Sequence, residues 1–160
     1  MTIAVGDKIP SVTIQRKTAD GIDQVSTDAY FAGRKVVLFA VPGAFTPTCS
    51  QKHLPGFIAD ADAITAKGVD EIACVSVNDA FVMEAWGAAH GAGGKVTMLA
   101  DGSAVLAKAL GLELDLVEKG LGTRSQRYAM VVDDGTVTLL NVEEGGQFEA
   151  SSAETILAAL

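Results

Sequence analysis

Short apolar runs bounded by turn residues predict most of the strands of this chain. One pair of runs flanks Asp20-Gly21 and another pair meets at Asp134-Gly135, and both patterns are typical of antiparallel hairpins. Three runs lie between the hairpins, and the first two are almost wholly apolar, which predicts strands buried on both faces. The predicted strands cover residues 12–15 and 22–26, then 35–41, 71–77 and 95–100, and finally the hairpin 127–142.

The stretch after the first middle strand predicts a helix that begins near Cys49. Thr48 is the expected N-cap, with Gln51 three residues later completing a capping box. Pro55 lacks the amide that would bond the carbonyl of Gln51, so we expect a kink there. One apolar stripe faces the core up to the glycine that ends the helix; it consists of Leu54, Phe57, Ile58, Ala61 and Ile64, ahead of Gly68.

Three further helices are predicted. Asn78 or Asp79 caps one of them, Ser103 caps a short one that Gly111 ends, and Ser151 caps the last, with Glu154 three residues on. The second helix of the chain is expected to turn one side to the core, namely Phe81, Val82, Ala85, Trp86 and Ala89.

The order of these elements predicts an α/β protein with one domain over residues 1–160. Parallel strands with crossover helices, followed by an antiparallel pair, predict a mixed central sheet flanked by helices. A thioredoxin-like fold with an N-terminal β-hairpin matches this order, and a flavodoxin-like or Rossmann-like sheet is the alternative.

Composition and charge narrow the class of protein. The 160 residues are 49% hydrophobic and 20% charged, a globular composition, and no apolar run approaches the ~18 residues of a membrane span. The N-terminus lacks the features of a signal peptide, so we expect a soluble cytoplasmic protein. The net charge of −8 disfavours nucleic acid as a partner and suits a small or neutral substrate.

The chain has two cysteines, Cys49 and Cys74, and no C-x-x-C pair. This spacing excludes a disulfide framework, a zinc knuckle and an ordinary dithiol motif. Any cysteine chemistry therefore belongs to single thiols or to one distant pair.

Cys49 stands where a thiol would be activated. It follows a buried strand across the loop PGAFTPT and occupies the first turn of the predicted helix, at the edge of the sheet where α/β proteins place their sites. The amides and dipole of a helix N-terminus favour an anion, which lowers the pKa of a cysteine from ~8.5 and makes it a nucleophile. Thr46 could donate to the sulfur or to a bound oxygen, and Pro42 could shield it from water. The same residues could equally build a strand-to-helix turn and no more.

The spacing Pro42-x-x-x-Thr46-x-x-Cys49 resembles the P-x-x-x-T-x-x-C signature of peroxiredoxins. The full stretch PGAFTPTCS is similar to their type II branch, which includes plant and bacterial glutaredoxin-dependent enzymes and mammalian relatives. The likeness continues in KHLPGF, VSVND and RSQRYAMVVDDG, so it covers essentially the whole chain.

The resemblance implies a thiol peroxidase that needs no cofactor or metal. It makes Cys49 the peroxidatic cysteine, with Thr46 and Pro42 completing its pocket. It also implies an arginine beside the thiolate, at the position before the aromatic residue of the late strand, which is Arg127. Arg124 is a close competitor, although a solvated loop charge is the favoured interpretation for it. The thiolate would attack hydrogen peroxide or an alkyl hydroperoxide and become a sulfenic acid.

Cys74 is either a resolving or a structural cysteine. It lies inside a predicted buried strand, where a free cysteine usually packs as a small hydrophobe. Type II relatives in plants often carry a cysteine here with a variable resolving role, whereas mammalian relatives use one near the C-terminus, where this chain has Ser151. We therefore expect recycling by an outside thiol, with glutathione and glutaredoxin first and thioredoxin second.

Other interpretations remain open. His53, one turn after Cys49, could form a Cys-His pair of a thiol hydrolase or, with Cys74, a metal site, but we expect a partly buried packing or hydrogen-bonding residue. A non-catalytic thioredoxin-like interaction or redox-sensing module is the second class of function. The segment GAGG at 91–94 reads as a loop and not as a dinucleotide fingerprint. Relatives dimerise near the active site, so a homodimer is expected; Phe45, Phe81 and Trp86 could line that interface, the pocket or the core.

Overall fold

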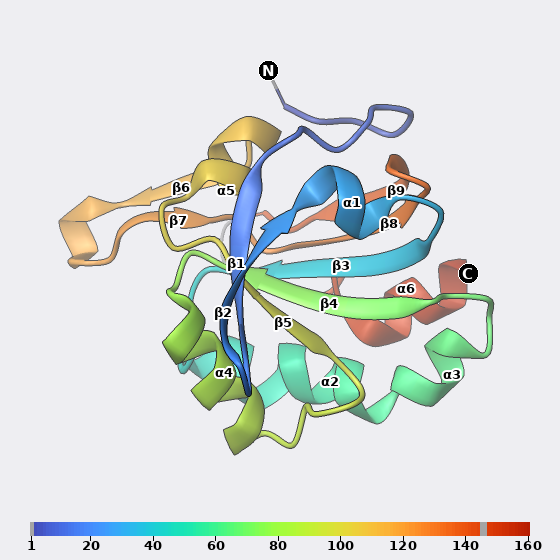
Figure 1. Cartoon of the computed structure of the whole chain (residues 1–160), viewed down its shortest axis with the longest axis horizontal. Helices are drawn as coiled ribbons and strands as arrows, with labels where there is room; N and C mark the ends of the chain where they lie inside the picture. Colours follow the sequence, from blue (N-terminus) through green and yellow to red (C-terminus); the bar gives the residue numbers. More distant parts are fainter. Residues whose placement is uncertain (1, 145–146) are drawn as a thin grey trace.

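The computed structural model describes residues 2–144 and 147–160, with the side chain of Cys49 outside the description. Its main feature is a seven-stranded sheet in the order β2-β1-β5-β4-β3-β8-β9 (Figure 1). The strands of this sheet are β1 (Thr13–Thr18), β2 (Gly21–Ser26), β3 (Lys35–Val41), β4 (Glu71–Ser76), β5 (Thr97–Ala100), β8 (Tyr128–Asp133) and β9 (Thr136–Val142).

The sheet is mixed, as the sequence predicts. β3 pairs in parallel with β4, and β4 with β5, whereas β8 runs antiparallel to β3 and β1 antiparallel to β5. Both expected hairpins are present, β1 with β2 and β8 with β9. The prediction of a thioredoxin-like mixed sheet with an N-terminal hairpin is therefore confirmed.

Helices cover both faces of this sheet (Figure 1). Alternate residues of β3 point to opposite sides, so that Val37 and Phe39 pack with Leu54, while Val36 and Leu38 pack with Leu106. The helical elements are α1 (Thr27–Phe31), a π-helical turn η1 (Cys49–His53), α2 (Leu54–Ala59), α3 (Ala61–Thr65), α4 (Ala80–Ala89), α5 (Val105–Leu110), a 3₁₀ turn η2 (Val117–Lys119) and α6 (Ala153–Ala159). Within the described ranges, none of these helices is long and apolar enough to cross a membrane.

The helix that carries Cys49 begins earlier than the sequence predicts. Helical backbone starts at Pro47, and the amide of Ser50 donates to the carbonyl of Thr46 at 2.9 Å, so Thr48 is inside the helix and is not its N-cap. Proline suits the first helical position because its missing N–H needs no partner there. Cys49 still lies in the first turn.

The irregularity expected at Pro55 appears just before it. Residues Cys49–His53 form a π-helical turn, and Pro55 sits at the start of the regular helix α2. Such turns insert where the ordinary hydrogen-bond ladder is interrupted, and they are frequent at functional sites.

Helix caps account for most of the remaining differences. Asp79 caps α4 as predicted, accepting from the amide of Val82 at 2.8 Å. The last helix, however, is capped by Ser152 and not by Ser151. Ser103 does not cap α5; instead, the Asp101 carboxylate accepts from two amides of its first turn. Gly111 ends that helix in the left-handed conformation, as expected.

The predicted core face of α4 is partly wrong. Its buried residues are Ala80, Met83, Trp86 and Gly87, whereas the side chain of Phe81 is 62% exposed. Four small elements of the described residues were not predicted: α1, the turn η2, and the two strands of a second sheet, β6 (Glu113–Leu116) and β7 (Gly122–Ser125). The latter projects from the body of the molecule (Figure 1).

Candidate active site

Three strand ends meet where the loop of residues 42–46 leaves the sheet. β3 ends at Val41, which pairs with Ser76 at the end of β4. On the other side of β3, the antiparallel β8 begins with Tyr128 opposite Ala40. This register places residue 127 next to the start of the loop, although 85 positions separate Arg127 from Pro42 (127 minus 42).

The loop is anchored by hydrogen bonds at several points. The Thr46 hydroxyl donates to the carbonyl of Gly43 at 2.6 Å, closing a tight turn. The amide of Ala44 donates to the side-chain oxygen of Asn78 at 2.9 Å, and that oxygen also accepts from the Ser76 hydroxyl at 2.7 Å. Asn78 therefore ties the end of β4 to this loop, a role that sequence reasoning missed although the stretch VSVND pointed to it.

Arg127 reaches the helical turn that carries Cys49. Its guanidinium donates from Nη1 to Nδ1 of His53 at 2.8 Å, and its central carbon lies 5.9 Å from the centre of the Phe148 ring. His53 and Cys49 belong to the same π-helical turn. The structure thus brings Arg127 to the start of this helix from the far end of the sequence.

His53 is fully buried, not partly buried as the sequence suggested. Its Nε2 bonds the carbonyl of Ser151 at 2.9 Å, and its ring lies among Phe39, Phe57 and Phe148. Burial and then the positive charge of Arg127 lower the pKa of His53 to about 3. The imidazole is therefore neutral but a weak base, and both of its nitrogens are engaged, which argues against its acting as the general base of a hydrolase.

Arg124 is not the solvated loop charge that we favoured. Its half-buried side chain donates to the carbonyl of Leu121 at 2.8 Å and to that of Pro42 at 3.4 Å. A Cβ on Gly43 would lie only 3.0 Å from its Nη1, so glycine leaves room for this guanidinium. Arg124 supports the backbone of the loop, while Arg127 approaches the helix.

Comparisons with known proteins identify the family. A family model described as Redoxin matches residues 4–157. The chain is 60% identical to Peroxiredoxin-2E-2, chloroplastic, of Oryza sativa subsp. japonica, over 99% of this chain and 73% of that protein. It is 55% identical to Peroxiredoxin-2B of Arabidopsis thaliana, over 99% and 98% of the two chains. The solved structure of reduced Prx3 in complex with H₂O₂ from Vibrio vulnificus matches with a TM-score of 0.96 and 59% identity, covering 99% of each chain.

This chain belongs to the type II peroxiredoxins. Family membership makes it a thiol peroxidase, and it removes the flavodoxin-like and Rossmann-like alternatives for the fold.

The second cysteine of this peroxiredoxin lies in the core. Cys74 is in the middle of β4, opposite Phe39 of β3 and Met98 of β5, and none of it is exposed. It packs with the apolar residues beneath α2 and α4. A thiol in this place cannot meet an outside partner unless the sheet or the helices above it open.

The start of the Cys49 helix is also fastened to α4. The indole of the buried Trp86 donates to the Ser50 hydroxyl at 3.0 Å. Trp86 is thus a core residue, whereas Phe45, in the left-handed backbone conformation, and Phe81 are exposed. Ala44 and Asn78, which neighbour these two phenylalanines closely in sequence, are hydrogen-bonded to each other.

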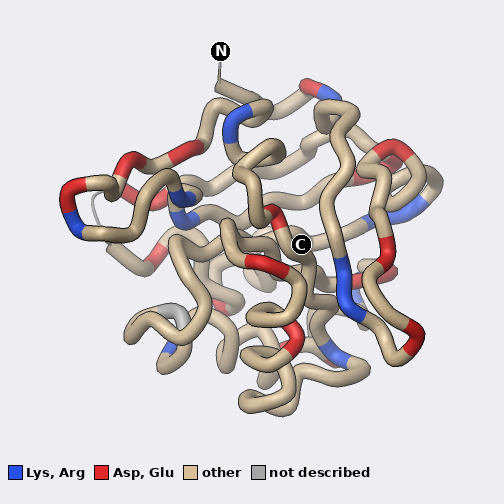
Figure 2. The backbone as a smooth tube through the Cα atoms, turned by 60° about the vertical axis from the view of Figure 1, so that its left-hand side comes forward, with Lys and Arg blue, Asp and Glu red and all other residues tan. Residues whose placement is uncertain are grey.

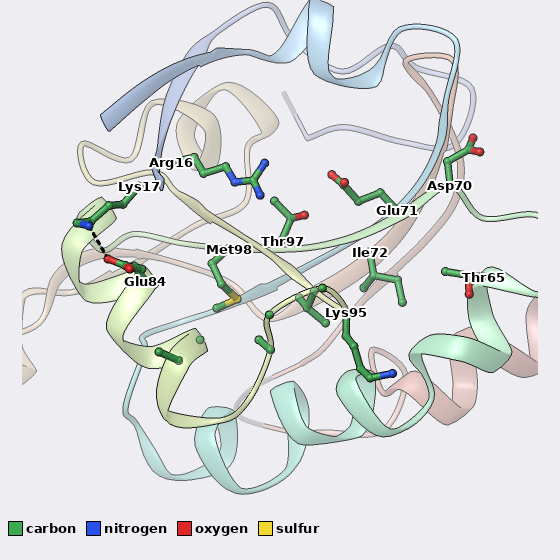
Figure 3. Close-up of a pocket in the computed structure, with 16 residues that line it drawn as sticks. Arg16, Lys17, Thr65, Asp70, Glu71, Ile72, Glu84, Lys95, Thr97 and Met98 are labelled. Atoms are coloured by element: carbon green, nitrogen blue, oxygen red, sulfur yellow. Dashed lines mark ion pairs between the residues drawn. The ribbon is translucent and has the colours of Figure 1, made fainter. Parts of the chain in front are cut away.

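A groove of about 510 Å³ lies elsewhere, beside α4, β5 and the GAGG loop (Figure 3). None of Pro42, Thr46 or Arg127 lines it. Several of its charges are already engaged: Lys17 pairs with Glu84 at 2.9 Å, and Glu71 accepts from the Tyr30 hydroxyl. It is therefore a poorer candidate for the peroxidase site than the Cys49 turn.

Proposed function

We propose that Cys49 is the peroxidatic nucleophile of this peroxiredoxin. The observation that carries the proposal is the reach of the Arg127 guanidinium, through its 2.8 Å bond to His53, to the helical turn that bears Cys49. A fixed cation beside a helix N-terminus favours the thiolate over the thiol. Pro42 and Thr46 lie at the two ends of the loop that leads into the same turn. There Thr46 would orient the peroxide and Pro42 would exclude water.

The proposed reaction breaks the O–O bond of a hydroperoxide. The Cys49 thiolate attacks the terminal oxygen, a sulfur–oxygen bond forms, and the other oxygen leaves with a proton from solvent as water or an alcohol. Cys49 is oxidised to sulfenic acid while the peroxide is reduced. Arg127 and the amides of the first turn stabilise the negative charge that spreads over the two oxygens. Hydrogen peroxide is a suitable substrate, since the Vibrio vulnificus relative is described in complex with it.

We infer that an outside thiol regenerates Cys49. The burial of Cys74 supports this, because a disulfide needs the two Cα atoms within ~7 Å and both sulfurs accessible to each other. Glutathione would attack the sulfenic acid and release water, leaving a mixed disulfide on Cys49. A glutaredoxin thiolate would attack the glutathione sulfur of this disulfide and free Cys49, and a second glutathione would then release glutathione disulfide from glutaredoxin. Thioredoxin is the second candidate.

Steady-state turnover with each reductant tests this function. Wild type and Cys74→Ser should consume hydrogen peroxide at similar rates with glutathione and glutaredoxin, while Cys49→Ser should lose turnover entirely. If Cys74→Ser turned over with neither glutaredoxin nor thioredoxin as reductant, Cys74 would be a required resolving residue. Activity with thioredoxin alone would overturn the choice of reductant, and turnover by Cys49→Ser would overturn the proposal itself.

A homodimer and a cytoplasmic location stay predictions. The exposed Phe45 and Phe81, in neighbouring segments at the active-site edge, would suit a contact with a second copy. Sedimentation equilibrium of wild type and of Phe81→Ser would test it, since a monomeric wild type would contradict the dimer. The relatives include proteins named chloroplastic, so similarity does not decide the compartment.

A further inference from the structure

His53 lies at the centre of a buried series of hydrogen bonds. An arginine only donates hydrogen bonds, so Nδ1 of His53 must accept the bond from Arg127. The proton of the neutral ring is then on Nε2, which donates to the carbonyl of Ser151. The two bonds, 2.8 and 2.9 Å long, therefore select one tautomer and one orientation of the ring.

The series of hydrogen bonds continues from Ser151 to Glu143 and returns to Arg127. The Glu143 carboxylate accepts from the Ser151 hydroxyl at 2.6 Å and from its amide at 2.8 Å. The backbone amide of Glu143 in turn donates to the carbonyl of Arg127 at 2.9 Å. Arg127 is thus held at its backbone and at its guanidinium by one closed series of hydrogen bonds.

Aromatic rings surround the His53 and Arg127 side chains of this series. The ring centres of Phe39 and Phe148 lie 4.8 and 5.0 Å from that of His53, and the Arg127 guanidinium also lies against Phe148. A free arginine side chain would lose rotamer entropy when it is ordered. Here that ordering is complete before any peroxide arrives, which is the condition for effective electrostatic stabilisation.

We propose that His53 is a positioning residue for Arg127 and that Ser151 and Glu143 hold its ring in the orientation that this task requires. The inference rests on the proposed peroxidase role of Cys49. It gives the C-terminal loop that contains Ser151 a part in the reaction, although that loop lies about a hundred residues from Cys49 in sequence (151 minus 49).

Three substitutions separate the two bonds of the ring. Asn at 53 can offer an oxygen near the place of Nδ1, Gln can offer an N–H near the place of Nε2, and Leu offers neither. Stopped-flow measurement should give His53→Asn a rate of oxidation by hydrogen peroxide between those of wild type and His53→Leu, because it keeps an acceptor for Arg127 but loses the bond to Ser151. His53→Gln and His53→Leu should be slower by about tenfold, a part of the ~10²–10³-fold that a directly bound donor supplies. His90→Leu, at the other histidine, is the matched control and should match wild type.

A second readout excludes a merely structural effect. The pH profile of Cys49 alkylation by iodoacetamide should move to higher pH in His53→Gln and His53→Leu, because a displaced Arg127 stabilises the thiolate less. If His53→Leu is oxidised as fast as wild type, or if His53→Asn is as slow as His53→Leu, the positioning role is wrong.

A double-mutant cycle shows whether the effect passes through Arg127. In an Arg127→Ala background, His53→Leu and Glu143→Gln should cause no further loss of rate, whereas independent losses would overturn the proposal. Glu143→Gln keeps the test valid if the His53 variants do not fold. A wild-type protein that reacts only as fast as free cysteine would refute the peroxidase function, whereas a fast His53→Leu would refute the positioning role alone.

Discussion

At the scale of single residues, the most informative side chain is His53, because its burial forces it to stay neutral. In the unfolded chain a histidine has a pKa near ~6.5, whereas in the folded chain burial and the charge of Arg127 lower the pKa of His53 to about 3. Between these two values the unfolded state binds a proton that the folded state does not. The stability that His53 contributes is therefore present above pH ~6.5 and is lost as the pH falls toward 3.

This linkage predicts a pH-dependent free energy of unfolding. Urea unfolding should give wild type about 2 kcal/mol less stability at pH 5 than at pH 7 from His53 alone. Burial raises the pKa of Asp101, so that residue contributes with the opposite sign, but it does so equally in a His53→Leu variant. The difference between the two pH values should thus be smaller in His53→Leu by that amount. Equal pH dependence in both proteins would contradict the neutral, buried imidazole.

At the scale of elements, substitutions at two adjacent residues distinguish an effect on stability from an effect on catalysis. Asn78 ties the end of β4 to the loop of residues 42–46, whereas Asp79 caps α4. Replacing either by Ala removes side-chain hydrogen bonds and should lower the free energy of unfolding by about 1 kcal/mol.

Only Asn78→Ala should also slow the oxidation of Cys49 by peroxide, because only Asn78 holds the backbone of the loop that carries Thr46. Asp79→Ala is therefore its matched control, with stability read from urea unfolding and the rate from stopped flow. A full oxidation rate in Asn78→Ala would mean that the loop keeps its shape without this anchor.

The elements also show how far local patterns extend. The middle strands and both hairpins were predicted because their apolar runs and Asp-Gly turns are local signals. Caps such as Ser151 and Ser152 are adjacent and chemically alike, so the choice depends on Glu143, which lies elsewhere in the chain. The predicted core face of α4 was partly wrong, because packing against the sheet decides which residues of the helix point inward. α1 is too short to show a helical period.

At the scale of the whole molecule, the sheet assembles the site from distant segments. The sequence predicted the loop and Cys49 from one local motif, but Arg127 came only from the resemblance, since no spacing links it to residue 49. The register of β8 against β3 supplies the missing link. The series of hydrogen bonds through Arg127, His53 and Ser151 could not be predicted from the sequence, because its bonds join residues that lie far apart in the chain.

The charge of the molecule is spread rather than concentrated. Lys and Arg segments alternate with acidic ones along the backbone, with no basic face visible in this view (Figure 2). In this acidic protein, with a net charge of −8, Arg127 is a half-buried cation at the candidate site. Its effect on Cys49 should accordingly depend little on ionic strength, because short, sheltered interactions are weakly screened.

The central claim is that peroxide reacts at Cys49. The most direct measurement is to expose the reduced protein to one equivalent of hydrogen peroxide with a sulfenic-acid trap and to locate the adduct by peptide mass spectrometry. The adduct should be on Cys49, Cys74 should stay unmodified, and Cys49→Ser should carry no adduct. An adduct on Cys74, or an unmodified Cys49 while peroxide is consumed, would contradict this claim.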